Sequence, residues 1–315
     1  AVAWNTDNFD PGTNLWDYSI NSYFTSPFGN RLPTGTYYVG AFIDFFDDGY
    51  DPDIDLDGDY EDGEPAGMFI NAVNSVSILE TGHDAIGVDI TTYDAITLHG
   101  PIQQVDLASP IGTGSPFVST PYPGGEVSLL SYPLKAAGDS TGDFTMQFVP
   151  LGPTLAIHGK PAAGSTLIPY NSKYAVFTTA DAWRPVSDPG EVTEVNLISP
   201  SVAAWLGSLC SVTVDTGKAL IAGQINDSGT GNSVLGAEVL FAGPAVKYID
   251  TGMNCNNTTT QDMGGGGPQF LIFNVDSTLY ADNKALISAS QSSTIIDSAY
   301  IPVVNGEFTL VDMEK

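Results

Sequence analysis

The sequence predicts an all-β protein made of tandem β-sandwich domains joined by one short helix. Glycine (34) and proline (21) are frequent, and few segments show the apolar spacing of an amphipathic helix. Many segments instead alternate apolar and polar residues, as half-buried strands do. A hydrophobic content of 42%, with 15 Phe, 14 Tyr and 4 Trp, is sufficient for packed cores. The chain is therefore expected to fold despite its charge.

The first predicted domain covers residues 1–96. Its strands are expected in TYYVGAFIDFF, MFINAVNSVSIL and AIGVDITTYD, where apolar residues recur at every second position. A strongly acidic stretch interrupts this pattern between the first two strands.

An internal repeat predicts that the next two domains, residues 97–198 and 199–315, are copies of one β-domain. Three pairs of segments correspond in the same order: GGEVSLL (124–130) with GAEVLF (236–241), FTMQFV (144–149) with FLIFNV (270–275), and AWRPVSDPGEVTEVNL (182–197) with AYIPVVNGEFTLVDM (299–313). The last pair needs one inserted residue, at a turn. Shared landmarks in a fixed order indicate a duplicated unit.

A short linker helix is predicted in SPSVAAWLG, between the two copies. Ser199 suits the N-cap, Pro200 the first helical position and Gly207 the exit. Its apolar face is expected to pack on a domain seam and carries Val202, Trp205 and Leu206.

The third domain has a Gly-containing first strand, a Gly-Ala-x-Val second strand and a later Phe-x-apolar-x-x-Val strand, in KALIAGQINDSGTGNSVLGAEVLFAGP and FLIFNV. This pattern resembles the carboxypeptidase-regulatory-like, or transthyretin-like, domain over about a third of the chain. The matching residues are Gly223, Gly236, Ala237, Val239, Phe270 and Val275. The second domain departs more, because its first strand is hard to place and its Gly-Glu-Val lacks the alanine.

The first domain, with AFID…DG…D…EPAG, is similar to bacterial prealbumin-like or Ig-like repeats, in which the acidic turn is associated with calcium. Together these resemblances imply three tandem Ig-like or transthyretin-like sandwiches. They also imply non-catalytic, extracellular building blocks.

The stretch from Asp44 to Glu64 contains 11 carboxylates and no lysine or arginine. Within it, DIDLDGDYEDGE (53–64) fits the calcium-loop template D-x-D-x-D-G-x5-E without a gap. Carboxylates at alternate positions can point into one concavity, Gly58 permits a sharp turn, and Glu64 can supply two oxygens. Calcium prefers such hard oxygen ligands, whereas zinc prefers nitrogen and sulfur.

We therefore predict that calcium binds this stretch; the alternative is a solvated acidic loop. The predicted ligands are Asp53, Asp55, Asp57, Asp59, Glu61 and Glu64, with Asp44, Asp47, Asp48 and Asp51 as oxygen donors to the same ion or to a second one. A strand precedes the loop, and Pro65 and Gly67 follow it, so we expect it between strands and not between helices. Ion binding would relieve carboxylate repulsion and rigidify the first domain.

The formal charge of −28 weighs against nucleic acid and anionic membrane surfaces as partners. Outside the 11 carboxylates of the acidic stretch, the chain still contains 26 acidic and only 9 basic residues. The sequence contains no apolar run of about 18 residues, so no membrane span is predicted.

Cys210 and Cys255 are the two cysteines, and neither belongs to a CxxC or Cys/His zinc spacing. A disulfide between them is predicted for an exported protein; two buried thiols are the alternative. The chain begins at Ala1 without a methionine, which fits a removed export signal, although an edited chain would begin in the same way.

The sequence contains no GxSxG, HExxH or catalytic Cys/His context, and we predict that the protein is not an enzyme. Of its three histidines, His158 lies on an alternating strand and is expected to be a satisfied strand residue.

The predicted function is an extracellular, calcium-stabilised structural protein that polymerises with itself as a subunit of a cell-surface filament or layer. One alternative is a carbohydrate-binding or adhesive module that contacts a glycan or another surface protein. Its basis is the N-terminal aromatic residues Trp4, Trp16, Tyr18, Tyr23 and Phe24. Another alternative is the non-catalytic accessory region of a secreted hydrolase.

Overall fold

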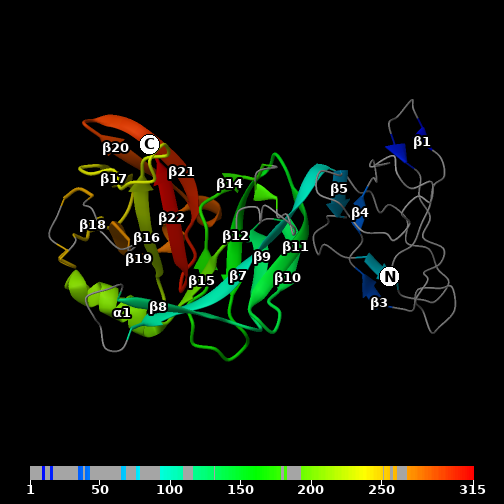
Figure 1. The fold of residues 1–315 in the computed structure, drawn as a ribbon, viewed down its shortest axis with the longest axis horizontal. Coiled ribbons are helices and arrows are strands. Elements are labelled where there is room, and N and C mark those ends of the chain that lie inside the picture. Colours follow the sequence, from blue (N-terminus) through cyan, green and yellow to red (C-terminus); the bar gives the residue numbers. More distant parts are fainter. Residues whose placement is uncertain are drawn as a thin grey trace. The chain divides into compact units, whose positions relative to one another are not determined.

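The computed structural model is an all-β sandwich structure, with one α-helix among the residues it describes, which confirms the predicted fold class (Figure 1). It describes residues 93–108, 116–130, 132–178, 181–182, 193–250, 252–255, 258–260 and 268–315, together with six short strands before residue 93. The chain separates into two compact units, residues 1–95 and 96–315.

The first unit contains short antiparallel strand pairs. The strands are β1 (Phe9–Asp10), β2 (Leu15–Trp16), β3 (Gly35–Tyr37), β4 (Gly40–Phe42), β5 (Pro65–Met68) and β6 (Val76–Ile78). β1 pairs with β2, β3 with β6, and β4 with β5. β5 also pairs with the first residues of β7, at Tyr93 and Asp94.

The second unit begins at Ile96, within strand β7, whose first three residues belong to the first unit, and its first strands form the second predicted sandwich. These are β7 (Tyr93–Leu107), β8 (Phe117–Pro121), β9 (Glu126–Leu130), β10 (Tyr132–Ala137), β11 (Asp143–Pro150), β12 (Thr154–Lys160), β13 (Tyr170–Asn171), β14 (Ala175–Val176) and β15 (Val195–Ile198). β7 is flanked by β11, β8 and a parallel β15, whereas β9 lies between β10 and β12. β12 also pairs with β13 and β14.

The third predicted sandwich follows helix α1 (Pro200–Leu209). Its strands are β16 (Ala219–Asn226), β17 (Glu238–Phe241), β18 (Lys247–Tyr248), β19 (Phe270–Val275), β20 (Lys284–Gln291), β21 (Thr294–Pro302) and β22 (Phe308–Glu314); two short 3-10 helices, η2 (Ser277–Leu279) and η3 (Ala281–Asn283), precede β20. One sheet has β16 between an antiparallel β19 and a parallel β22, and β18 lies at its edge. The facing sheet has the order β17-β20-β21.

Part of the strand order agrees with the predicted internal repeat, although β8, β10 and β14 have no counterpart among the described strands of the third sandwich. β7 with its neighbours β11 and β15 corresponds to β16 with β19 and β22, including the parallel partner in each copy. Likewise, β9-β12-β13 corresponds to β17-β20-β21. Two segments of one sequence pattern therefore share part of their strand arrangement.

The two copies share a sheet. β13 pairs in parallel with β22, at Tyr170↔Phe308 and Asn171↔Thr309, and the Phe308 amide donates to the Pro169 carbonyl at 2.8 Å. A nine-stranded sheet thereby runs from β10 to β18. Residues 96–315 consequently form one compact unit, and a division at residue 198 stays a prediction.

The core of the third sandwich explains the glycine and alanine of its motif. A Cβ on Gly223 would lie 2.3 Å from the Val311 carbonyl oxygen and 2.4 Å from the Phe270 ring, so only glycine fits between β19 and β22. Gly236 has φ +73°, where a side chain is strained, and it places the fully buried Ala237 in the core.

Helix α1 begins as predicted, with Ser199 as the N-cap and Pro200 in the first turn. It ends at Leu209 and not at Gly207, which is buried inside the helix. A Cβ on Gly207 would lie 2.6 Å from the Val212 carbonyl oxygen. That glycine permits the close return of the chain after the helix, so the predicted exit was wrong.

Candidate functional site

The predicted calcium ligands, from Asp44 to Glu64, all lie outside the described residues. The structure does describe the two segments that flank them. β4 precedes the acidic stretch and β5 follows it, and the two strands pair antiparallel at Phe42↔Ala66. The prediction that strands and not helices flank the stretch is therefore confirmed, whereas calcium binding stays a prediction. Among the described residues, no group of three or more His, Cys, Asp or Glu side chains is placed to hold a metal ion.

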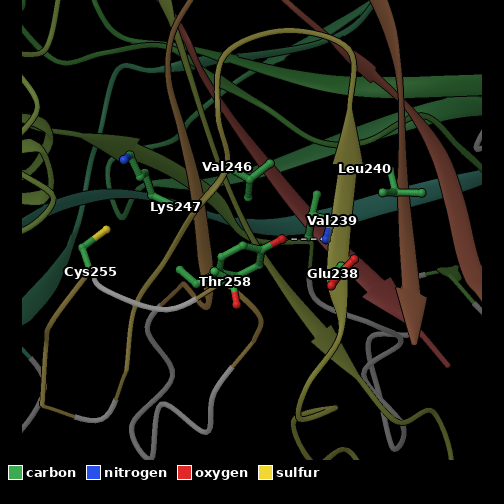
Figure 2. Close-up of a pocket in the computed structure, with 8 residues that line it drawn as sticks. Glu238, Val239, Leu240, Val246, Lys247, Cys255 and Thr258 are labelled. Carbon is green, nitrogen blue, oxygen red and sulfur yellow. Dashed lines mark hydrogen bonds between the residues drawn. The ribbon is translucent and has the colours of Figure 1, made fainter. Parts of the chain in front are cut away.

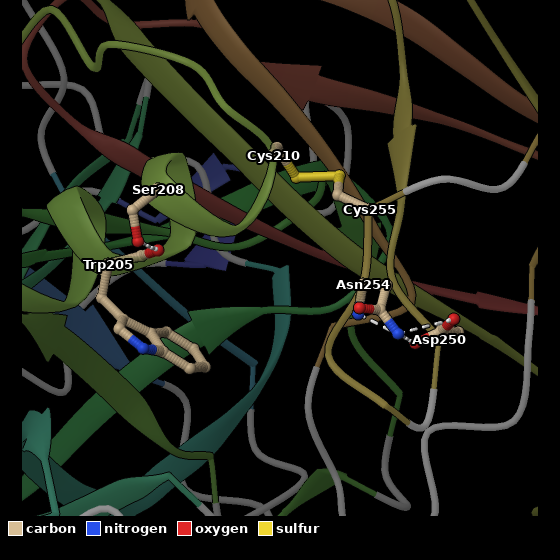
Figure 3. Close-up of a disulfide and its surroundings, with 6 residues drawn as sticks. All are labelled: Trp205, Ser208, Cys210, Asp250, Asn254 and Cys255. Atoms are coloured by element: carbon tan, nitrogen blue, oxygen red, sulfur yellow. Dashed lines mark hydrogen bonds between the residues drawn. A yellow bond between two sulfur atoms is a disulfide. The ribbon is translucent and has the colours of Figure 1, made fainter.

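The predicted disulfide is confirmed (Figure 3). Cys210, at the C-cap of α1, is bonded to Cys255 across 45 residues of sequence. A tight turn before Cys255 is built around Asp250, whose Oδ1 accepts hydrogen bonds from the Asn254 amide at 2.8 Å and Nδ2 at 3.1 Å. The bond ties the linker helix to the loop after β18.

Trp205 of α1 is half-buried, and its ring meets Phe117 of β8 edge-on with centroids 5.5 Å apart. This contact confirms the predicted packing role, because it seats the helix on the second sandwich. Together with the disulfide, it attaches the helix to both copies.

An open groove of about 490 Å³ lies beside the disulfide, between the edge strands β17 and β18 (Figure 2). Its lining includes Glu238, Lys247, Cys255 and Thr258. The Val239 amide donates to the Tyr248 hydroxyl at 2.7 Å, and burial raises the pKa of this tyrosine. The Val239 N–H at the edge of β17 is therefore already hydrogen-bonded to the Tyr248 hydroxyl. This limits the pairing of β17 with a strand of another chain.

Polar side chains form a row where the two sandwiches join. Ser128 of β9, His158 of β12 and Asn171 of β13 occupy paired positions on neighbouring strands. His158 Nδ1 lies 3.4 Å from Ser128 Oγ, and its Nε2 lies 3.5 Å from Glu307 Oε1, at the outer limit of a hydrogen bond. Asn171, which is fully buried, donates through Nδ2 to Glu307 Oε2 at 2.8 Å.

The environment of Glu307 favours its ionised form. Burial alone would raise the pKa of this carboxyl, but the contacts from His158 and Asn171 and the nearby charge of Lys160 outweigh burial and lower it. His158 is on its predicted strand, and its Nδ1 contacts Ser128. Its buried Nε2 makes no hydrogen bond with the described residues and only the 3.5 Å contact with Glu307, so the prediction of a fully satisfied histidine was wrong at this nitrogen. The sequence analysis missed Glu307, because the parallel β13–β22 pairing that brings it to His158 connects distant segments.

The described residues thus define an all-β sandwich protein whose two related sandwiches share one sheet, with a disulfide that ties the linker helix to the third sandwich. No helix among them has the length and apolar composition needed to cross a membrane.

No protein-family model matches the chain, and no curated protein matches it. Among solved structures, the shaft pilin SpaA from Lactobacillus rhamnosus GG is similar at 11% identity and a TM-score of 0.22, covering 70% of this chain and 97% of the pilin. GBS52, the minor pilin of Streptococcus agalactiae, is similar at 12% identity and a TM-score of 0.19, covering 70% and 94%. The Bacillus anthracis TIE protein has 11% identity, a TM-score of 0.19 and coverage of 76% and 37%. These values assign the chain to no family.

Proposed function

We propose that this chain is an extracellular, calcium-stabilised structural protein and a subunit of a cell-surface filament or layer. The observation that carries the proposal is the construction of residues 96–315, in which two copies of one sandwich share a nine-stranded sheet. A shared sheet resists bending between modules, because relative motion would break the backbone hydrogen bonds of β13 and β22. Such a rigid module suits a load-bearing role.

The disulfide supports the extracellular part of the proposal. Disulfides persist in oxidising compartments and are rare in the cytosol. Cys210 is only 8% exposed, and its bond to Cys255 encloses the α1 exit, β16 and β17 in one covalent loop. An exported structural protein gains stability from such a loop without needing a larger core.

The calcium part rests on the template between β4 and β5. A connection with 11 carboxylates and no basic residue repels itself, and cation binding removes this repulsion. At free calcium 100-fold above the dissociation constant, binding would stabilise the folded state by about 2.7 kcal/mol.

Electron microscopy of the native protein, in calcium and after EDTA treatment, tests the assembly. We expect filaments or layers in calcium and their loss or loosening on chelation. Monodisperse particles under every condition would contradict a filament or layer, and glycan-array binding by such particles would favour the adhesive alternative.

Thermal unfolding with and without EDTA tests the stabilising role of the ion. We expect chelation to lower the transition of the first unit, and Asp55→Asn with Asp57→Asn to abolish the calcium response. Asp139→Asn is a suitable control, because this exposed carboxylate lies in a turn far from the acidic stretch in sequence. A melting curve unchanged by EDTA would exclude the structural role.

A further inference from the structure

The outward side of the sheet β17-β20-β21 exposes four large apolar or aromatic side chains around a strip of serines. We call it the outer face and define it by Glu238, Leu240, Lys284, Leu286, Ser288, Ser290, Ile295, Ser298 and Tyr300. Its four apolar or aromatic members are 48–59% exposed. The residues between them, such as Val239 and Ile287, point into the core, so the alternation of each strand fixes which side chains face outward.

Large side chains on the outer face are neighbours. Leu286 on β20 is directly opposite Tyr300 on β21, and Leu240 on β17 is opposite Ser288, two residues further along β20. Figure 2 shows Leu240 and Glu238 on β17. Leu240, Leu286 and Tyr300 form one cluster, whereas Ile295 is paired with Ser290 and lies apart from it. Single exposed apolar residues need no explanation, but a cluster is a candidate interaction surface.

The outer face carries opposite charges at its two ends. Glu238 pairs with Ser290 near one end of β20, and Lys284 pairs with Pro302 at the other. Among the described residues, neither side chain forms a salt bridge. Lys284 Nζ instead lies 4.2 Å from the centroid of the Tyr174 ring and 4.8 Å from that of the Tyr300 ring, which holds this charge at the rim.

The second sandwich shows that the fold does not require this apolar surface. Glu126 and Ser128 are the repeat equivalents of Glu238 and Leu240. Glu126 forms a salt bridge with Lys135 at 3.3 Å, and Ser128 contacts His158. The glutamate therefore forms a salt bridge in one copy, whereas Glu238 forms none with the described residues in the other.

The two charges of the outer face fit a second copy of this chain. The formal charge of −28 opposes association of two copies, so a contact between them requires a face with few carboxylates. The outer face offers one carboxylate and one ammonium group. A two-fold axis in the contact plane and perpendicular to the strands exchanges the two ends of the face, which brings each glutamate towards the lysine of the other molecule.

We propose that the outer face binds the outer face of a second copy, with contacts through Leu240, Leu286 and Tyr300 and with Glu238–Lys284 pairs at the two ends. The proposal rests on the function proposed above, because it supplies one of the contacts that a self-assembling subunit needs. Packing of sheets face to face through such side chains is the usual arrangement in sandwiches.

Sedimentation velocity of the full chain over a range of concentrations and salt tests this contact. We expect a monomer–dimer equilibrium in the wild type that strengthens as salt screens the net charge. Leu286→Glu should weaken dimerisation on the order of tenfold or more, since it places a charge in the apolar cluster of Leu240, Leu286 and Tyr300. Val118→Glu, at a similarly exposed position on β8, should leave the equilibrium unchanged.

Charge reversal provides a second test that does not disturb the core. Glu238→Lys and Lys284→Glu alone should each weaken dimerisation, and the double variant should restore it. A wild type that is monomeric at all concentrations would overturn the proposal. Dimerisation that Leu286→Glu leaves unchanged would do the same. So would a double variant that dimerises no more tightly than the two single variants.

Electron microscopy of the same variants separates this proposal from the filament or layer. Wild-type dimers that form no larger assembly would support the outer-face contact and contradict the proposed function. Assemblies that persist in Leu286→Glu would support the proposed function and overturn the outer-face contact.

Discussion

The second and third sandwiches of this protein share part of a strand arrangement but are held together differently. In the third, the interior is apolar and its motif glycine, Gly223, is tightly enclosed, and a disulfide secures the loop beside it. In the second, the sheet that continues into its neighbour carries a row of polar side chains that ends at Glu307. The two copies thus share part of their strand order but differ in the interactions that stabilise equivalent positions.

The largest expected effect comes from opening the disulfide. Cys255→Ser should lower the free energy of unfolding of the second unit by up to about 4 kcal/mol, because the unfolded chain regains the entropy of a 45-residue loop. Denaturant unfolding measures this loss. Cys210→Ser combined with Cys255→Ser should be insensitive to a reducing agent, whereas the wild type should weaken in its presence. An unchanged wild-type midpoint on reduction would contradict the prediction.

A methyl group at Gly223 tests the packing of the third sandwich. Gly223→Ala should destabilise the unit by about 3 kcal/mol, since its Cβ would overlap a backbone oxygen and an aromatic ring. Gly236→Ala is the matched control, because its Cβ meets open space and only the backbone is strained, at about 1 kcal/mol. Similar losses for both variants, measured by chemical denaturation, would show that close packing is not the cause.

The polar row of the second sandwich should respond to acid. The pKa of Glu307 is lowered from its usual value of 4.5, so the stability it contributes is present above that pH and is lost as pH falls through the folded-state pKa. The difference in unfolding midpoint between the wild type and Glu307→Gln should therefore shrink below about pH 4.5. Glu126→Gln, in an exposed pair, serves as the control. A difference that stays constant with pH would rule out ionised Glu307 as the stabilising group.

The smallest effect concerns the β20–β21 turn, which Ser292 and Ser293 form with φ of 51° and 65°. Left-handed backbone is unfavourable for serine and suits Asn-Gly. Ser292→Asn with Ser293→Gly should stabilise the unit by about 1 kcal/mol in thermal unfolding. Ser208→Gly, on the exposed surface of α1, should instead destabilise it, and stabilisation by both changes would point to a different cause.

The sequence was most informative where a local pattern has a local cause. Alternating residues predicted the strands, Ser199 and Pro200 predicted the helix start, and the Gly-Ala-x-Val pattern corresponds to a left-handed glycine before a buried alanine. The disulfide followed from the presence of two cysteines alone.

The sequence was least informative where distant segments meet. The β13–β22 pairing involves only two residues on β13, which leaves no periodic signal. Glu307 is brought to His158 by that pairing. Gly207 is required because the Val212 carbonyl oxygen, later in the chain, lies where a side chain would be. The Ser-Ser turn lacks the glycine that usually marks such hairpins. The calcium ligands lie outside the described residues, so that prediction stands as made.

The parallel pairing of β16 with β22 has a mechanical consequence. Leu220 to Asn226 are aligned with Phe308 to Glu314 in the same direction, and β16 opens the sandwich whereas β22 closes it. A tensile force that pulls residue 219 and residue 314 in opposite directions would load all of these hydrogen bonds in shear at once, and they could not open one at a time. Rupture under such a force depends on the unfolding barrier and not on equilibrium stability. Single-molecule pulling between these two ends should therefore show a higher rupture force than pulling across the β20–β21 hairpin, whose strands can separate from one end.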